Sequence, residues 1–317
     1  MTETPTHILV ADVGGTNSRV AFAIDGIVQN ASIKRFKNAD YPSLDAVLIE
    51  FLRHNSEVDI SALCVAVAGM VLPDVTELTN LNWRITKDSL AKSVNVSSVS
   101  VINDLQAQGH ALSDIPAKNL KSIMRGTTQS TDGAKLVVGI GTGFNAAPVH
   151  NSAQSTIVVP SECGHISLPV YSEQDLNMRD HLATGSGFAS VEEVLSGRGL
   201  EQVYAWHARE DGSRKTSHQI MQDCARGDDK YARMTVKTCV HILGRVCGDL
   251  ALTHLPYQGI YLVGGVARAL TPYLDTFGFN DQFTSKGRMS EFLKAFSVFV
   301  VEDDYAALTG CANTVGT

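Results

Sequence analysis

The sequence has 317 residues, of which 44% are hydrophobic and 19% charged, a balance typical of a globular protein with a sizeable core. The formal net charge is -7 at pH 7, and the lysine and arginine residues are scattered along the chain. These electrostatics exclude a general affinity for nucleic acid or for acidic membrane surfaces.

The cysteine pattern and the lengths of the apolar runs indicate in which cellular compartment the protein resides. The six cysteines form no CxxC pair and no zinc-finger spacing, as expected for reduced thiols in a cytosolic protein. The N-terminal MTETPTHILV has no secretion pattern, and no run approaches the roughly 18 to 20 apolar residues of a membrane span. We therefore expect a cytoplasmic protein without a membrane segment.

Short apolar, β-branched runs predict strands, most of which end in Gly, Asp or Glu. In chain order they are HILVADV, ALCVAVAG, VSVIND, KLVVGIG, STIVVPS, GIYLVGG and FSVFVVED. A helix is predicted after Pro42 and Ser43, and a longer one over about Lys230 to His254, whereas Ala208 to Asp229 is polar and is expected to be a solvated surface segment. The alternation predicts an α/β architecture, with ligands where strand ends meet helix starts.

Three predicted strands end in glycine turns, which expose backbone N–H groups and so form cradles for anions. The turns contain Asp12, Gly14, Gly15 and Thr16; then Gly139, Gly141, Thr142 and Gly143; and finally Gly264 and Gly265. Neither a complete dinucleotide fingerprint nor a GxxxxGK[ST] loop occurs, so a nucleotide site would be of another kind. Asp12 either holds a hydrated magnesium ion beside phosphate or only satisfies its own turn.

Asn103 and Asp104 directly follow a predicted strand, at the expected start of a helix. An aspartate there is commonly a helix cap, which is the default interpretation. Asp104 also suits a general base that orients a hydroxyl nucleophile in phosphoryl transfer, with Asn103 bonding a neighbouring hydroxyl.

Glu162 and His165 interrupt an apolar run in IVVPSECGHISL. If buried, both side chains need partners, and a hydroxyl-rich ligand would supply them. A single Glu-x-x-His is poor support for a metal site, and a core histidine bonded to backbone is the alternative.

Two acids stand side by side in ASVEEVLSGRGL. Ser190 and Glu193 match the capping-box pattern S-x-x-E at the start of a helix. Glu192 is then either an exposed acid in the first helical turn or a carboxylate that faces a ligand.

Together these residues resemble the bacterial ATP-dependent glucokinases, of the family within the actin-like ATPase and sugar-kinase superfamily that lacks the zinc-binding cysteine motif of the repressor/kinase group. The resemblance runs almost end to end. Its motifs, in the family's order, are DVGGTNSR, YPSL, LTNLNW, INDLQA, GIGTG, SECGHISLP, EEVLSGRGL, YLVGGVA and KGRMSEF.

The resemblance implies two α/β domains of the actin-like ATPase (ribonuclease H-like) type flanking a cleft. The small domain would comprise residues 1–110 and 300–317, including a last helix near Ala306 to Thr314, and the large domain residues 111–299. Asp104 matches the family's catalytic base. The residues that match its glucose-binding set are Asn103, Asp104, Glu162, His165 and Glu192.

The three glycine turns match the family's nucleotide-binding loops. The matching residues are Asp12, Gly14, Gly15, Thr16, Gly139, Gly141, Thr142, Gly143, Gly264 and Gly265. The implied reaction is transfer of the ATP γ-phosphoryl group to glucose, giving glucose 6-phosphate, with Mg²⁺ held by Asp12 through water. A homodimer is also implied. The alternatives are a kinase for another hexose and a sugar-binding sensor of the same fold with weak catalysis.

Besides Met70, which stands where a proline is common in a turn of the small domain, the sequence departs from the family's usual pattern in two places. Cys163 stands where Glu-Gly-Gly-His has its first glycine, and Phe144-Asn145 replaces the more usual Leu-Gly. The first change bears on the width of the sugar pocket and the second on contacts to the nucleotide.

Overall fold

The computed structural model describes residues 7–55, 58–71, 76–78, 81–128, 130–152 and 155–315. Residues 79 and 80 of the motif LTNLNW, and the chain ends 1–6 and 316–317 expected in the small domain, lie outside the described residues. The chain divides into two compact units. The first unit is Met1–Pro116, Ser152–Pro160 and Asp303–Thr317, and the second is Ala117–Asn151 and Ser161–Glu302. Segment Ser152–Pro160, assigned from sequence to the large domain, belongs to the first unit.

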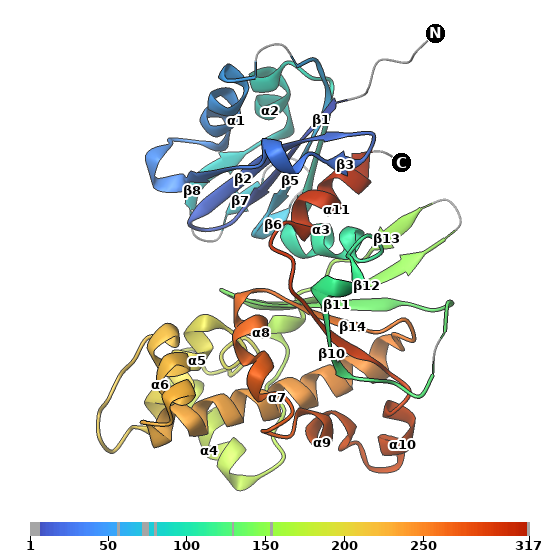
Figure 1. Ribbon diagram of the computed structural model, residues 1–317. Coiled ribbons are helices and arrows are strands. Elements are labelled where there is room, and N and C mark those ends of the chain that lie inside the picture. The colour runs from blue at the N-terminus through green and yellow to red at the C-terminus, as the bar shows by residue number, and fades with distance from the viewer. Residues whose placement is uncertain are drawn as a thin grey trace. The chain divides into compact units, whose positions relative to one another are not determined.

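The first unit is built on a sheet with the strand order β3-β2-β1-β5-β9, in which β4 also pairs with β2 (Figure 1). The strands are β1 (His7–Val13), β2 (Asn17–Ile24), β3 (Ile27–Val28), β4 (Lys34–Lys37), β5 (Ile60–Val67) and β9 (Ser98–Asn103). β1 and β2 form an antiparallel hairpin, whereas β1, β5 and β9 are parallel. Carboxyl ends of the parallel strands therefore meet at one edge of the sheet.

Helices cover both faces of this sheet (Figure 1). They are α1 (Leu44–Arg53) and α2 (Lys87–Val94) on one face, and α3 (Asp104–Ala111) and α11 (Ala306–Val315) on the other. Side chains alternate along β1: Leu9 packs with the α1 face and Val10 with the α11 face. α11 lies so close to α3 that a Cβ on Gly310 would be 1.7 Å from the Ala107 carbonyl oxygen.

The remaining elements of the first unit are short. They are β6 (Gly69–Val71), β7 (Thr76–Leu78) and β8 (Leu81–Ile85), which form an antiparallel sheet, and β13 (Thr156–Val158). β13 lies beside α3, where the Gln106 side-chain amide donates to the Val158 carbonyl oxygen over 3.2 Å. The run STIVVPS thus forms a shorter strand than its pattern predicted.

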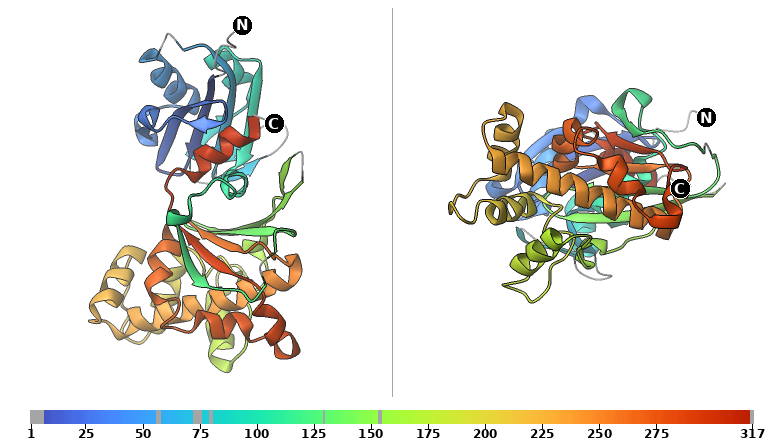
Figure 2. Two further views of the ribbon diagram at one scale, coloured as in Figure 1. Left: turned by 45° about the vertical axis from the view of Figure 1, so that its right-hand side comes forward. Right: turned by 90° about the horizontal axis from the view of Figure 1, so that it is seen from below.

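The second unit has the strand order β10-β15-β14-β11-β12, with β11, β14 and β15 parallel. Its strands are β10 (Leu120–Met124), β11 (Lys135–Ile140), β12 (Phe144–Asn151), β14 (Ile260–Val263) and β15 (Val298–Val301). Its helices are α4 (Glu173–Leu182), α5 (Gly197–His207), α6 (Ser217–Arg226), α7 (Lys230–His254), α8 (Gly265–Leu270), α9 (Phe279–Thr284) and α10 (Ser290–Leu293). The apolar face of α7 packs with β11 in one buried core, along one side of the sheet (Figures 1 and 2).

Both predicted helices are confirmed, and the mixed α/β class with them. Ser43 caps α1 by accepting a hydrogen bond from Ala46 N–H over 3.3 Å, and α7 spans Lys230–His254. The polar segment Ala208 to Asp229 is mostly exposed, as expected, and it contains α6. α6 has its own capping box at Thr216 and a glycine C-cap at Gly227.

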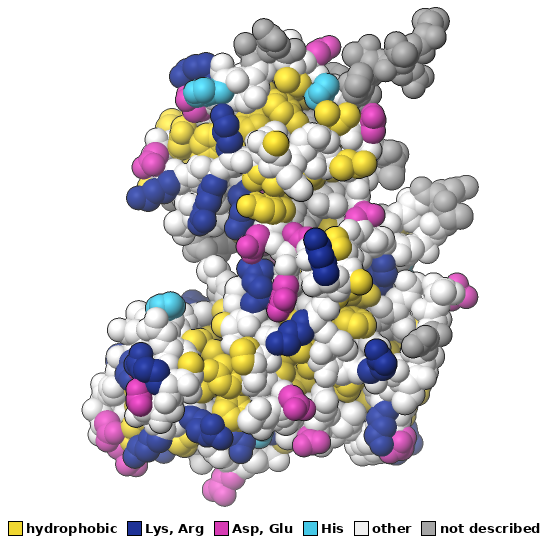
Figure 3. All heavy atoms as spheres, viewed as in Figure 1, with side chains coloured by type: hydrophobic (Ala, Val, Ile, Leu, Met, Phe, Trp, Pro, Cys, Tyr) yellow, Lys and Arg dark blue, Asp and Glu magenta, His cyan; other side chains and the backbone are white. Residues whose placement is uncertain are grey.

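The distribution of charged side chains on the surface and the apolarity of the helices agree with what the sequence composition predicted. On the face shown in Figure 3, Lys and Arg side chains are separated by acidic and uncharged ones rather than gathered into one patch. Among the described residues, no helix combines the length and the apolarity that crossing a bilayer requires.

Candidate active site

The register of the first sheet brings two of the predicted elements to one edge. Val13 at the end of β1 pairs with Val67 of β5, and Val67 pairs with Asn103 of β9. The glycine turn after Val13 and the start of α3 at Asp104 are therefore two strand spacings apart, or about 10 Å. This edge is where an open α/β sheet binds its ligands.

The first glycine turn closes the β1–β2 hairpin. Gly14 N–H donates to the Asn17 carbonyl oxygen over 3.0 Å, and Gly15 and Thr16 are exposed at the tip. Asp12 pairs with Arg19 across the hairpin at 2.9 Å. Burial raises the pKa of Asp12, and the positive charge of Arg19 opposes that rise. Asp12 is thus not satisfied by its own turn alone but by a cation on the opposite strand.

Asn38 also shapes this turn, and its role was not predicted from sequence. Its side chain is 1% exposed, donates to the Gly14 carbonyl oxygen over 2.7 Å and accepts from the buried Ser18 hydroxyl over 2.7 Å. The Asn38 N–H donates to the Thr16 carbonyl oxygen over 3.0 Å. No local pattern signals these contacts, because the residues are 20 or more positions apart in sequence.

The structure assigns the cap of α3 to Asn103 rather than Asp104. The Asn103 side chain accepts from Leu105 N–H over 2.9 Å, and Gln106 completes a capping box by accepting from the Asn103 N–H over 3.2 Å. Asn103 also donates to the Gly69 carbonyl oxygen over 3.0 Å. Asp104 is the first residue of the helix, is half-buried, and accepts from Leu105 N–H over 2.9 Å.

The second and third glycine turns lie side by side in the second unit. They follow the paired strands β11 and β14, in which Gly139 is opposite Val263. Gly264 has a φ of 101°, and a Cβ there would be 2.4 Å from the Ile140 carbonyl oxygen. By contrast, a Cβ on Gly141 or Gly265 would meet no atom within 4 Å. Close packing therefore fixes the two turns, while open space remains beside them.

Glu192 connects the second glycine turn to the segment that carries Glu162. Its carboxylate accepts from Phe144 N–H over 2.9 Å and would be 2.5 Å from a Cβ on Gly143. Its backbone N–H donates to the Gly164 carbonyl oxygen over 2.9 Å. Glu192 is therefore not an exposed acid in a helical turn, because only 22% of its side chain is accessible and no helix begins there.

The capping box predicted from Ser190 and Glu193 is wrong. Ser190 forms a β-bridge with Ser167, and α5 begins only at Gly197, capped by Ser196. The side chain of Glu193 instead accepts from Arg198 over 3.2 Å. The pairing of Ser190 with a residue 23 positions earlier overrides the local helix-start pattern.

Glu162 and His165 are exposed, so neither is a core residue that needs buried partners. Glu162 precedes a single 3-10 turn, Cys163–His165, of which His165 is the last residue and in which His165 N–H donates to the Glu162 carbonyl oxygen over 3.1 Å. Gly164 inside this turn is buried against β12, where a Cβ would be 2.0 Å from the Phe144 carbonyl oxygen. The turn therefore presents an acid and an imidazole to solvent from a fixed backbone.

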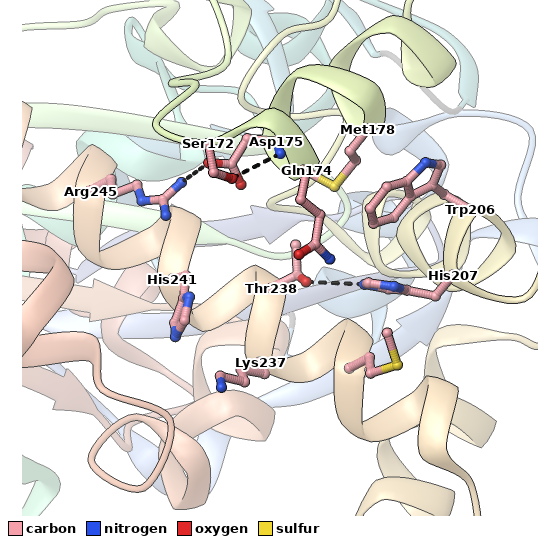
Figure 4. A pocket seen from close by; sticks show the side chains of 11 residues that line it. Ser172, Gln174, Asp175, Met178, Trp206, His207, Lys237, Thr238, His241 and Arg245 are labelled. Carbon is pink, nitrogen blue, oxygen red and sulfur yellow. Dashed lines mark hydrogen bonds and ion pairs between the residues drawn. The ribbon is translucent and has the colours of Figure 1, made fainter.

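A separate hollow of about 300 Å³ lies among α4, α5 and α7 (Figure 4). Arg245 in its wall is paired with Asp175 at 2.7 Å, and His207 is paired with Thr238 at 3.1 Å (Figure 4). None of the predicted site residues lines it. Because its polar side chains largely satisfy each other, we interpret it as a junction between helices.

Within the part of the chain that the structure describes, no group of three or more His, Cys, Asp or Glu side chains is arranged to hold a metal ion. The six cysteines are all free thiols, five of them buried and Cys163 half-buried. A site with several protein ligands to zinc is thus not among the described residues.

Comparison with known proteins gives a consistent result. The glucokinase family model matches residues 9–316. A curated glucokinase of Rhizobium johnstonii is 30% identical over 312 residues, which cover 98% of this chain and 91% of that protein. The crystal structure of a glucokinase from an Antarctic psychrotroph aligns with a TM-score of 0.85 and 29% identity, over 98% of both chains.

A structure with lower sequence identity has a similar fold. A ROK family glucokinase from Streptomyces griseus, solved in complex with glucose and AMPPNP, aligns with a TM-score of 0.67 and 19% identity over 98% of this chain and 99% of that one. These alignments confirm the fold expected from the sequence, the actin-like ATPase type of the sugar kinases.

Proposed function

The chain belongs to the glucokinase family, and from this premise we propose how its own residues carry out the ATP-dependent phosphorylation of glucose. The family match spans nearly the whole chain, so the reaction is the family's: ATP and glucose give ADP and glucose 6-phosphate. Each predicted site residue has a part in binding the two substrates or in moving the proton.

Asp104 is the general base. It orients the primary hydroxyl of glucose and accepts its proton as the bond to the γ-phosphorus forms. The observation that carries this assignment is the sheet register, which puts Asp104 and the first glycine turn about 10 Å apart on one edge. Because Asn103 supplies the helix cap, capping does not explain why an aspartate stands at position 104.

The other predicted residues bind the remaining hydroxyls of glucose. Glu162 and His165 are exposed on a fixed turn and offer an acceptor and a donor or acceptor. Glu192 is held by Phe144 N–H, which orients its carboxylate. The side chain of Asn103 is already bonded to Leu105 and Gly69, so it can offer glucose its second amide hydrogen and the second lone pair of its oxygen.

The glycine turns bind the phosphates of ATP. Gly15 and Thr16 are exposed at the tip of the first hairpin, and the second turn exposes Thr142. Gly141 and Gly265 leave open space where any side chain would project. Backbone N–H groups at such positions approach phosphate oxygens closely and stabilise charge that spreads over the transferred group.

Mg²⁺ fits the first turn only as a hydrated ion. Asp12 stands two residues before Gly14, and one oxygen of its carboxylate already pairs with Arg19. A single carboxylate with its water shell is a common way for proteins to hold Mg²⁺ beside phosphates. The ion would neutralise phosphate charge there, and its positive charge, with that of Arg19, would oppose the rise that burial causes in the pKa of Asp12.

An ADP-release assay with glucose, fructose, mannose and N-acetylhexosamines tests the reaction. We expect release that depends on glucose. A preference for another hexose would replace glucose as the substrate, and glucose binding without ADP release would identify a sensor. The Asp104→Asn substitution should lower kcat by about 10³-fold with glucose binding largely kept. A kcat close to the wild-type value would remove Asp104 from the mechanism.

We also propose that the enzyme acts in the cytoplasm as a homodimer, as the family resemblance implies. Sedimentation equilibrium of the purified chain tests the second point directly. A mass of one chain at micromolar concentration would contradict it.

A further inference from the structure

The side chain of Asn145 is the centre of a hydrogen-bond network next to the second glycine turn. Its oxygen accepts from four donors: Ala146 N–H (2.8 Å), Cys163 N–H (3.2 Å), the Ser161 hydroxyl (3.1 Å) and the Cys163 thiol (3.5 Å). Its amide nitrogen donates to the Ser161 carbonyl oxygen. One side chain thus binds the backbone on both sides of Glu162.

Several other contacts tie the same two segments together. The Ser161 hydroxyl, which has a single proton, shares it between the Asn145 oxygen and the Ala146 carbonyl oxygen, which is the nearer acceptor at 2.6 Å. Gly164 packs directly against the Phe144 carbonyl, and Phe144 N–H donates to Glu192. The first residues of β12 therefore hold the turn with Glu162 and His165 on one side and Glu192 on the other.

This network matters because the residues that it holds in place are exposed. Glu162 and His165 are exposed, and the turn itself is a single turn of 3-10 helix. Burial raises the pKa of Cys163, so its thiol stays protonated and remains a donor to Asn145. Precise positioning of an exposed ligand-binding turn depends on such supporting hydrogen bonds.

We propose that Asn145 is a positioning residue for hexose binding: it fixes the turn of Glu162 and His165 to the strand that follows the second glycine turn. Asn145 does not contact the sugar; it acts through Glu162. The inference rests on the proposed function, since it concerns the affinity of that site for glucose. Asn145 and Cys163, at both of which the chain departs from the family's usual pattern, are direct partners.

The test compares Asn145→Ala, Ser161→Ala and Cys163→Ala in the full chain, with glucose binding followed by titration calorimetry and turnover by ADP release. We expect Asn145→Ala to raise the glucose Kd and KM by about 10- to 100-fold, with kcat and the ATP KM changed less than about threefold. Ser161→Ala, which removes one donor, should raise the glucose KM by about threefold. Cys163→Ala should change it by less than about twofold, because its backbone N–H still donates to Asn145.

A control separates positioning from loss of stability. Asn55 is also half-buried and donates to the Phe51 carbonyl oxygen over 2.8 Å, in the other unit. Asn55→Ala should lower Tm without changing the glucose Kd. If Asn145→Ala lowers Tm while its glucose Kd stays at the wild-type value, Asn145 is structural and the inference is wrong. If Asn145→Ala does not fold, Ser161→Ala decides: an unchanged glucose Kd overturns the inference.

A double-mutant cycle tests whether Asn145 acts through Glu162. In a Glu162→Ala background, Asn145→Ala should weaken glucose binding by less than about twofold, because the group that it positions is gone. Equal effects in both backgrounds would contradict the inference. Its failure differs from failure of the proposed function, which would appear as a wild-type chain that neither binds nor phosphorylates glucose.

Discussion

The two units make glycine turns of similar composition rigid by different means. In the first unit, the turn after β1 is held by side chains, above all by Asn38, which bonds Gly14 and Ser18. In the second unit, the turns after β11 and β14 are held by backbone contact, since Gly264 lies against the Ile140 carbonyl. The first arrangement tolerates a larger residue at the turn but needs a distant amide. The second requires the absence of a Cβ at Gly264, and the Glu192 carboxylate adds a hydrogen bond to Phe144 N–H beside the turn after β11.

The largest expected effect tests the backbone contact. Gly264→Ala places a Cβ 2.4 Å from the Ile140 carbonyl oxygen at a φ of 101°. Strain and overpacking together should lower the free energy of unfolding of the second unit by about 4 kcal/mol. Urea unfolding measures it, with Trp206 as the reporter of that unit in a Trp83→Phe background. A loss below about 1 kcal/mol would mean that the backbone around Gly264 shifts easily to accommodate the Cβ.

The next effect is a pH dependence expected in the second unit. Burial, together with the positive charge of Arg209, lowers the pKa of His207 to about 4. Unfolded histidine titrates near 6.5, so between these values the unfolded chain binds a proton that the folded chain does not. Stability is therefore complete above pH 6.5 and should fall by about 3 kcal/mol as the pH drops to 4.

His207→Gln is the matched variant for this prediction. Glutamine keeps a hydrogen-bonding group near Thr238 but does not titrate. The difference between unfolding free energies at pH 7.5 and pH 4 should be smaller by about 3 kcal/mol than in the wild type. Parallel pH profiles for the two chains would show that His207 does not cause the acid sensitivity.

A smaller effect tests the side-chain support in the first unit. Asn38→Ala leaves the Ser18 hydroxyl and the Gly14 carbonyl without their buried partner. We expect a loss of about 2 kcal/mol in the unfolding of that unit, followed by Trp83 in a Trp206→Phe background. The ATP KM should rise while the glucose Kd stays constant. A constant ATP KM would separate Asn38 from the nucleotide turn.

The smallest effect on folding is expected at Gly265, which follows Gly264 and lacks its close backbone contact. A Cβ on Gly265 meets nothing within 4 Å, so Gly265→Ala should change the unfolding free energy by less than about 1 kcal/mol. The ATP KM should nevertheless rise, because the open space is where we place phosphate. If both quantities are unchanged, Gly265 does not border the nucleotide.

The same contrast explains what the sequence could predict. The strands β1, β5, β9, β11, β14 and β15, the helices α1 and α7, and all three glycine turns follow from local patterns. Of the glycines in the second unit, Gly264 stands where close packing excludes a Cβ. Asn38 gave no signal, since its partners are 20 or more residues away. The Ser190 cap was predicted wrongly for a similar reason: a pairing with Ser167 replaced the helix start. Local chemistry is readable from sequence, whereas contacts between distant segments are not.

The position of α11 bears on how the chain is made. It covers one face of the first sheet, with Leu308 buried beside Val10 of β1 and Gly310 against Ala107. On the ribosome, β1 emerges early, but this cover is added only after the whole second unit has been translated. During translation of the second unit, the apolar face of the first sheet that α11 later covers therefore stays exposed. Chaperones bind exposed apolar surface of this kind.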